Sequence, residues 1–182
     1  MVIQKQLTVL VTGGTGGIGL HSAIGIAKTG ARVLVTGRDA PRGEAARNTI
    51  EEASGNPDII FVQGNLSSIN GIDQLAKAVS AHTGALDVLV NNAGYFGDTL
   101  CESSDGLEMH FAVNVLAPWR LTHALLAILQ AAPQARVLNV SGGDKPARID
   151  PDNLQAEKGF KGLMTYTHSK SVLEAMSMHL SQ

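Results

Sequence analysis

The sequence has 182 residues, of which 44% are hydrophobic, 14 are Lys or Arg and 16 are Asp or Glu, giving a formal net charge of -2. This length suits one domain with a sizeable core. Because charges of both signs are scattered and no apolar run reaches about 18 residues, the sequence lacks a basic stripe, a polybasic patch and a candidate membrane span. We therefore expect neither nucleic acid nor a membrane as a partner.

The sequence contains a single cysteine, Cys101, which cannot form an intrachain disulfide. Its N-terminal residues carry one early lysine and no small-residue cleavage pattern. These features predict a cytoplasmic protein. The six histidines and Cys101 show no spacing typical of a zinc site, so we expect no metal.

Short runs rich in Val, Leu and Ile alternate with longer segments of helical periodicity. Strands are expected at residues 7–11, 32–36, 59–63, 87–90 and 136–140, and helices at 17–28, 43–52, 69–81, 107–129 and from about 164 onward. This alternation predicts an α/β fold, a doubly wound Rossmann-type parallel sheet with helices on both faces. The long irregular segment at 142–163 lies before the last helix, where a substrate could be held.

The residues after the first strand, 12–20, read TGGTGGIGL and lead into a helix. Glycine allows a tight turn and a close approach of the backbone to a pyrophosphate, and the helix N-terminus offers free N–H groups. Such a turn alone is equally consistent with a structural role, but its place between a strand and a helix favours dinucleotide binding. No Lys-Ser or Lys-Thr pair follows, which argues against a Walker-type loop.

The second strand ends in TGRD, residues 36–39. An acidic side chain at this point accepts hydrogen bonds from the ribose of NAD, whereas the phosphorylated ribose of NADP needs an arginine. Gly37 leaves room beside Arg38 for the 2′-phosphate, which the guanidinium can bind bidentately. We therefore favour NADP(H) over NAD(H). The alternatives are that Arg38 is solvated while Asp39 binds the ribose, or that Asp39 caps the next helix.

Five motifs follow one another along the chain: TGGTGGIG at 12–19, NNAG at 91–94, Asn114 in FAVNVLAP, Ser141 in VLNVSGG, and YTHSK at 166–170. Together they resemble the short-chain dehydrogenase/reductase family, with its TGxxxGxG turn and active-site YxxxK. The stretches GRDAPRGEAA and DNLQAEKGFKG are similar to the retinol-dehydrogenase-like branch, which implies NADP(H) and apolar carbonyl or alcohol substrates. Without the family, Tyr166 and Lys170 would be an ordinary surface pair one helical turn apart.

The resemblance implies a cofactor-binding set in five segments: Thr12, Gly13, Thr15, Gly17, Ile18 and Gly19 in the glycine turn, Arg38 after the second strand, Asn65 and Leu66 after the third, Asn92, Ala93 and Gly94 after the fourth, and Tyr166 with Lys170 in the last helix. Asn65 stands where the family often has an aspartate. Its amide oxygen can accept the same hydrogen bond from adenine, so adenine binding is expected to survive.

The resemblance also implies a catalytic set of Tyr166, Lys170, Asn114 and Ser141. Tyr166 would be the general acid/base, and the Lys170 ammonium would favour its phenolate and hold the nicotinamide ribose. Asn114 would position a water that relays protons to Lys170.

The position of the catalytic serine is uncertain from the sequence. In the family, the second of two small residues after the fifth strand supplies the hydroxyl, and an ungapped alignment places Ser141 first and Gly142 second. Because strand side chains alternate between faces, a slip of one residue decides whether Ser141 faces the nicotinamide. A bulge at Gly142 and Gly143 would bring Ser141 into place.

Family members usually continue beyond the Tyr166 helix with two further strands. We interpret residues 1–182 as a single dinucleotide-binding domain that stops within this helix, so that the fifth strand is an exposed edge. A truncated chain, a chain completed by another subunit and a genuine short form all remain open.

The leading hypothesis is an oxidoreductase that transfers a hydride between NADP(H) and a small-molecule carbonyl or alcohol. The alternative is a catalytically incompetent module that binds NADP(H) without turnover. The helices at 107–129 and 164–180 would also suit the interface of a homodimer or homotetramer, although their apolar spacing fits packing on the sheet equally well.

Overall fold

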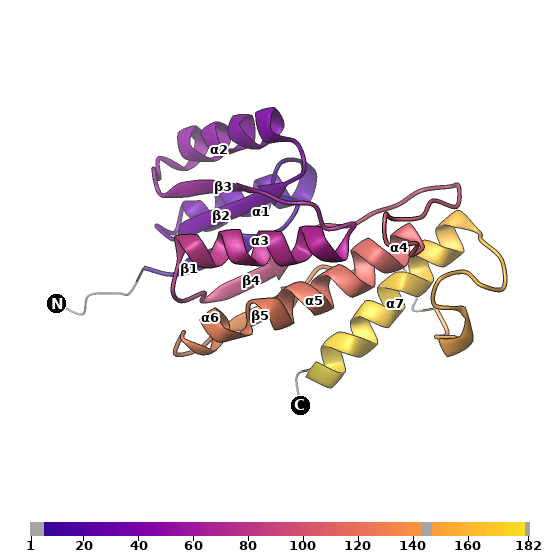
Figure 1. Cartoon of the computed structure of the whole chain (residues 1–182). Helices are drawn as coiled ribbons and strands as arrows, with labels where there is room; N and C mark the ends of the chain where they lie inside the picture. The colour runs from indigo at the N-terminus through magenta and orange to yellow at the C-terminus, as the bar shows by residue number, and fades with distance from the viewer. Residues whose placement is uncertain (1–5, 143–146, 181–182) are drawn as a thin grey trace.

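A computed structural model describes residues 6–142 and 147–180. Its centre is one sheet of five parallel strands in the order β3-β2-β1-β4-β5. The strands are β1 Thr8–Val11, β2 Arg32–Gly37, β3 Ile59–Gln63, β4 Val88–Asn91 and β5 Arg136–Asn139. Helices cover both faces of this sheet (Figure 1). The predicted doubly wound Rossmann-type fold is therefore confirmed.

The core is divided between the two faces of the sheet because the strand side chains alternate. Leu10 and Leu34 project to one face, against residues of α3 (Ile69–His82) and α5 (Ala117–Ala124). Val9 and Val33 project to the other, against α1 (Gly17–Ala27) and α2 (Ala40–Ser54). Burial on both faces explains why the strands read as nearly continuous apolar runs.

The sequence predicts the positions of α1, α2 and α3 to within a few residues, and two of them have side-chain caps. Asp39 accepts a hydrogen bond from the backbone N–H of Arg42 at 2.8 Å, and Ser68 caps α3 by accepting one from Gly71 at 3.2 Å. Of the alternatives weighed for Asp39, the structure shows the helix cap.

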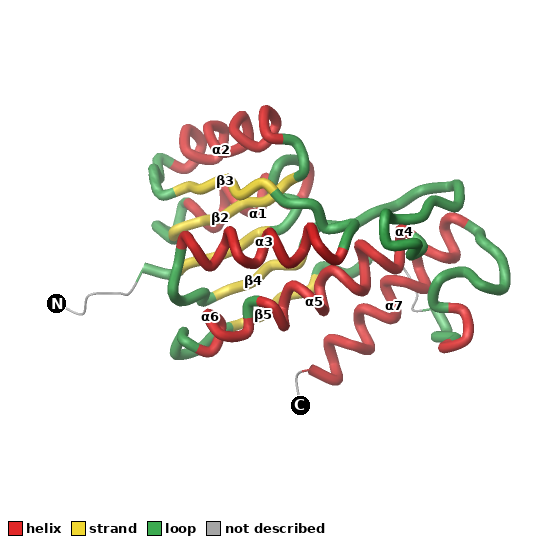
Figure 2. The backbone as a smooth tube through the Cα atoms, in the orientation of Figure 1, coloured by secondary structure: helices red, strands yellow, loops and turns green. Residues whose placement is uncertain are grey.

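The helix predicted at residues 107–129 is present from Met109 to Gln130, but it is not one regular α-helix. The structure divides this segment into α4 (Met109–Phe111), a π-helical turn η1 (Ala112–Leu116), α5, and α6 (Leu126–Gln130) (Figure 2). In the π-turn the backbone N–H of Ala117 donates to the carbonyl of Ala112, five residues back. The chain bends again at Leu125, whose ψ of 4° interrupts the helix.

The chain passes from β5 through a loop and the short 3-10 helix η2 (Pro151–Asn153) into α7 (Gly162–Leu180). In the described sheet β5 is an edge strand, and Val137 and Leu138 are 37% and 52% exposed. Within residues 6–142 and 147–180, no helix is long and apolar enough to cross a membrane.

Candidate active site

The glycine turn after β1 leaves the start of α1 open to a ligand. Gly13 and Gly17 have positive φ angles of 64° and 53°, which favour glycine over any residue with a side chain. Gly16 precedes α1 and makes no side-chain capping bond. The N–H groups of the first turn therefore remain available to an anion, which the positive end of the helix dipole also attracts.

A network of hydrogen bonds joins this turn to the turn after β4. Thr12 is 1% exposed, and its Oγ1 accepts from the backbone N–H groups of Asn92 and Ala93 at 3.1 and 3.0 Å. The Asn92 amide Nδ2 also donates to the carbonyl of Thr12 at 2.9 Å. A Cβ added at Gly19 would overlap the Asn92 side chain and the Gly13 carbonyl. The two turns thus form one floor at the carboxyl ends of the neighbouring strands β1 and β4. The strand order reverses between these strands, which is the usual ligand position in such sheets.

A cleft of about 500 Å³ opens above this floor. It contains most of the residues predicted to bind the cofactor: Gly13, Thr15, Ile18, Gly19, Arg38, Leu66, Asn92, Ala93, Gly94, Tyr166 and Lys170. Ser141 also lines it. Thr12 and Gly17 do not line the cleft but shape its floor. The structure therefore brings the N-terminal turn together with two residues of the last helix.

A second arginine, Arg42, lines the same cleft as Arg38. Arg42 Nε donates to the carbonyl of Thr15 at 3.2 Å, and its guanidinium lies against Gly16. Both arginines are exposed. Sequence reasoning missed Arg42, although a second arginine in the first turn of the helix that follows Arg38 was a usable signal.

Besides Thr12 and Gly17, the predicted cofactor residue Asn65 does not line the cleft. Its Oδ1 accepts hydrogen bonds from Ser67, from the backbone N–H at 3.0 Å and from the hydroxyl at 2.8 Å. Its neighbours Gly64, Leu66 and Ser67 line the cleft instead. The amide oxygen proposed to face adenine is thus engaged in a local turn.

Asn114 lies in the π-turn, completely buried, and braces the loop after β4. Its Oδ1 accepts from the backbone N–H of Tyr95 at 2.8 Å. Its Nδ2 donates to the carbonyl of Tyr95 and to Ser169 Oγ, both at 3.0 Å. The amide thereby connects the loop after β4 to α7. A Cβ built on Gly94 would lie 3.5 Å from Asn114 Oδ1 and 3.6 Å from Lys170 Nζ, so only a small residue keeps these groups adjacent.

Lys170 is 5% exposed, and its Nζ donates to the carbonyl of Val140, after β5, at 3.0 Å. The Nζ lies 5.9 Å from the centroid of the Tyr166 ring. Burial lowers the pKa of Lys170 below its ordinary value, because desolvation penalises the charged ammonium. An ammonium has three N–H donors, so two remain for a ligand.

Tyr166 lines the same cleft beside an apolar wall. Its ring packs edge-to-face on Phe96 with centroids 5.4 Å apart, and Phe96 is 51% exposed. Behind them His110 is fully buried, with ring centroids 6.2 Å from both. His110 Nε2 accepts from the backbone N–H of Gly97 at 3.2 Å, which holds the loop that carries Phe96.

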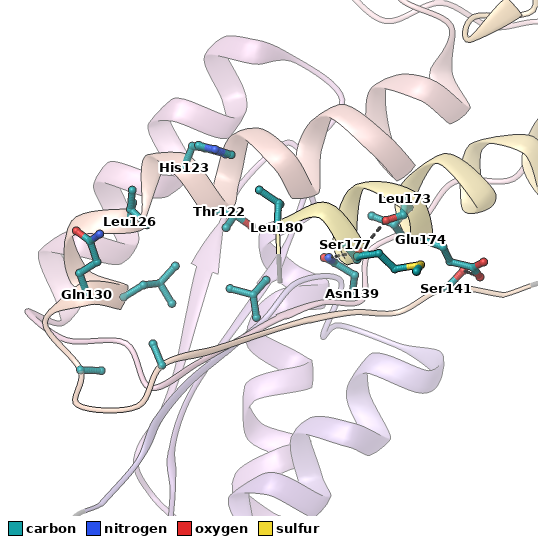
Figure 3. Close-up of a pocket in the computed structure, with 15 residues that line it drawn as sticks. Thr122, His123, Leu126, Gln130, Asn139, Ser141, Leu173, Glu174, Ser177 and Leu180 are labelled. Atoms are coloured by element: carbon teal, nitrogen blue, oxygen red, sulfur yellow. Dashed lines mark hydrogen bonds between the residues drawn. The ribbon is translucent and has the colours of Figure 1, made fainter. Parts of the chain in front are cut away.

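The structure does not bring the Ser141 hydroxyl to Tyr166. The β4–β5 register continues through Val140, whose N–H donates to the carbonyl of Asn91 at 2.9 Å, so no bulge interrupts the alternation before Ser141. Ser141 Oγ donates to Glu174 Oε1 of α7 at 2.5 Å. Asn139, two residues earlier, likewise bonds α7 through Ser177 at 2.7 Å. These side chains line a separate groove of about 900 Å³ between β5, α5, α6 and α7 (Figure 3).

Gly142 occupies the position that faces the tyrosine. A Cβ built on Gly142 lies 3.6 Å from Tyr166 Oη and meets no other described atom within 4 Å. The ungapped alignment, with glycine at the second position, therefore matches the structure. Gly143, the other residue of the bulge considered from the sequence, lies outside the described residues.

Comparison with known proteins agrees with this site. The family model of short chain dehydrogenases matches residues 7–182. The chain belongs to the short-chain dehydrogenase family. It is 38% identical over 163 residues to retinol dehydrogenase 11 from Homo sapiens, covering 89% of this chain and 51% of the relative. Retinol dehydrogenase 14 from Homo sapiens is 32% identical over 177 residues, covering 90% and 53%. The predicted resemblance to the retinol-dehydrogenase-like branch is thus confirmed, and the chain spans about half the length of these relatives.

Solved structures of the family show the same fold. An uncharacterized protein from Mycobacterium Paratuberculosis superposes with a TM-score of 0.83 at 28% identity, covering 96% of this chain and 61% of the other. A metagenomic short-chain oxidoreductase in complex with NADP gives a TM-score of 0.75 at 28% identity, with coverages of 96% and 74%. The second likeness shows that a related sheet binds this dinucleotide.

Proposed function

We propose that this chain binds NADP(H) and transfers a hydride between it and a carbonyl or alcohol, with Tyr166 as the general acid/base. The observation that carries the proposal is that a single cleft contains the glycine turn, Arg38 and Arg42 at one end, and Tyr166 with Lys170 at the other. NADPH bound in this cleft would supply a hydride to the carbonyl carbon.

The residues present fit such a dinucleotide. The uncapped start of α1 and the close packing at Gly19 suit a pyrophosphate that approaches the backbone. Arg38 and Arg42 are both exposed at one end of the cleft, where two guanidiniums would neutralise a 2′-phosphate. This pair supports a preference for NADP(H) over NAD(H).

In the proposed reduction, the Tyr166 hydroxyl donates its proton to the carbonyl oxygen and becomes a phenolate. The Lys170 ammonium, held by the Val140 carbonyl, stabilises that phenolate electrostatically. Because this ammonium is poorly solvated, its attraction to the phenolate is stronger than it would be in water. A lowered pKa at Lys170 also eases proton release from the ammonium. Asn114 keeps the loop after β4 seated on α7, so that Gly94 stays beside Lys170.

The substrate class follows from the surface beside Tyr166. Phe96 presents a half-exposed ring there, which favours an apolar or aromatic group next to the carbonyl. The relatives named retinol dehydrogenases support an apolar alcohol or its carbonyl.

We further propose that residues 1–182 act as one cytoplasmic unit. A homodimer or homotetramer through α5 and α7 would cover exposed Trp119 and Met178, which light scattering at several concentrations would test.

The test is oxidation of NADPH by the purified chain with a panel of apolar aldehydes and ketones, repeated with Tyr166→Phe. Tyr95→Phe is the matched control, because it removes another phenol hydroxyl from the same cleft. The Tyr95 hydroxyl interacts with Cys101 and not with Tyr166. Tyr166→Phe should lower kcat by about 10²- to 10⁴-fold while NADPH still binds. NADPH binding without turnover of any carbonyl would support the non-catalytic module instead.

A further inference from the structure

Position 142 leaves an open space beside the proposed acid. Among the residues that the structure describes, apart from its chain neighbours, only the Tyr166 hydroxyl comes within 4 Å of a Cβ built on Gly142. Its backbone lies outside the left-handed region, so alanine or serine would be accepted there without strain. The residue is also exposed, and a side chain added to it would project into the cleft rather than into the core.

Ser141 precedes Gly142 in the sequence, but its hydroxyl does not enter this space. Ser141 points to the opposite face of the strand and donates to Glu174 on α7. The other hydroxyls of the cleft in the described part of the chain lie elsewhere: Thr36 is buried in β2, Thr15 lies beside Gly37, Ser67 bonds Asn65, and Tyr95 lies beside Gly97. Tyr166 is therefore the described hydroxyl that reaches the space beside Gly142.

We propose that Gly142 is a specificity-determining residue of this site, which selects ketones over aldehydes. The proposal rests on the function proposed above. Hydride adds to the carbonyl carbon, the Tyr166 proton goes to the oxygen, and NADPH is oxidised as the carbonyl becomes an alcohol. The space at Gly142 accepts the second carbon substituent of a ketone. The carbonyl oxygen has Tyr166 as its side-chain donor, without the second donor that a serine at 142 would provide.

The test compares benzylacetone with hydrocinnamaldehyde, which differ only by a methyl group on the carbonyl carbon. Gly142→Ala fills the space without adding a donor. It should lower the ratio of kcat/KM for the ketone to that for the aldehyde by about tenfold or more, the usual effect of one methyl group in a pocket. Its Kd for NADPH should stay within about twofold, since the proposed phosphate contacts in the glycine turn and at Arg38 are distant from the added methyl group.

Gly142→Ser separates the two parts of the proposal. It occupies the same space as Gly142→Ala but adds a hydroxyl to the Cβ, which lies 3.6 Å from Tyr166 Oη. Relative to Gly142→Ala, it should raise kcat for hydrocinnamaldehyde by about tenfold or more, because a second donor stabilises the charge that develops on the oxygen. Ser141→Ala tests the competing assignment of the donor, and on this proposal it changes kcat by less than about threefold.

The outcomes separate this inference from the proposed function. A ketone-to-aldehyde ratio that Gly142→Ala leaves unchanged, or a loss of about 100-fold in Ser141→Ala, overturns the inference while the proposed function stands. If wild type binds NADPH without turnover but Gly142→Ser gains a turnover that Tyr166→Phe abolishes, the donor part is supported. If no variant turns over either carbonyl, the inference fails together with the proposed function.

Discussion

The two ends of the cleft are specified in different ways. At the dinucleotide end, Asn92 donates two hydrogen bonds to Thr12 across two turns, and Gly19 fits because any side chain would overlap its neighbours. At the Tyr166 end, Gly142 faces open space and Ser141 turns to the opposite face of the strand. The first end is fixed by close backbone packing. The chemistry of the second depends on which of two consecutive residues, Ser141 or Gly142, faces Tyr166. Substitutions should therefore affect the two ends differently.

The largest expected effect in this comparison is at Lys170. Lys170→Met should lower kcat by about 100-fold or more, because the phenolate of Tyr166 loses its adjacent cation. In wild type, burial lowers the pKa of Lys170 from 10.5, so the rate that depends on the ammonium should fall as pH rises through that lowered value. The measurement is the pH profile of kcat, in which the fall at high pH should be absent in Lys170→Met. A fall that is unchanged in the variant would show that another group titrates.

The same pKa shift has a consequence for stability. Above the lowered pKa and below 10.5, the unfolded chain binds a proton at Lys170 that the folded chain has released. The free energy of unfolding should therefore rise with pH through this window. Urea titrations at several pH values would measure this slope. Lys170→Met should remove its contribution, and an equal slope in both proteins would place its origin elsewhere.

A smaller effect is expected at the dinucleotide end from Arg38→Ala. Loss of a guanidinium that pairs with the 2′-phosphate should weaken NADPH binding by about 10- to 100-fold and leave NADH binding within about twofold. Arg47→Ala is the matched control, because Arg47 lies in α2, the helix that follows Arg38, but pairs with Glu44 and Glu51 outside the cleft. Calorimetry with both cofactors distinguishes the cases, and equal losses for NADPH and NADH would remove Arg38 from phosphate recognition.

The smallest effect is on folding, and it compares two glycines of α1. Gly19→Ala should cost about 1–3 kcal/mol of unfolding free energy, because its methyl group would overlap Asn92 and the Gly13 carbonyl. Gly25 lies in the same helix with nothing within 4 Å of an added Cβ, so Gly25→Ala should instead stabilise by about 0.5–1 kcal/mol. Urea unfolding measures both, and a neutral Gly19→Ala would show that the floor of the cleft is more yielding than its contacts indicate.

Much of this arrangement is predictable from the sequence because it follows local rules. Alternating apolar runs predict the strands, and the glycine turn predicts the open start of α1. The split of residues 107–129 is not predictable in this way, since the π-turn follows from the tertiary contacts of Asn114 with Tyr95 and Ser169. Periodicity alone reads the segment as one helix.

The candidate site shows the same division. The motifs group Tyr166 and Lys170 with the glycine turn, and the structure brings these residues together in one cleft. They leave the choice between Ser141 and Gly142 open, because that choice depends on whether β5 continues in register, which only the pairing with β4 reveals. The local turn that engages Asn65 also depends on a nearby hydroxyl, that of Ser67, and not on the motif itself.

The most direct test of the central claim is a calorimetric titration of the purified chain with NADPH and, in parallel, with NADH. The account predicts one site per chain and an affinity for NADPH at least about tenfold above that for NADH, reflecting the paired arginines. Failure of both dinucleotides to bind would contradict it, because the cleft that joins the glycine turn to Tyr166 and Lys170 would then not be a cofactor site.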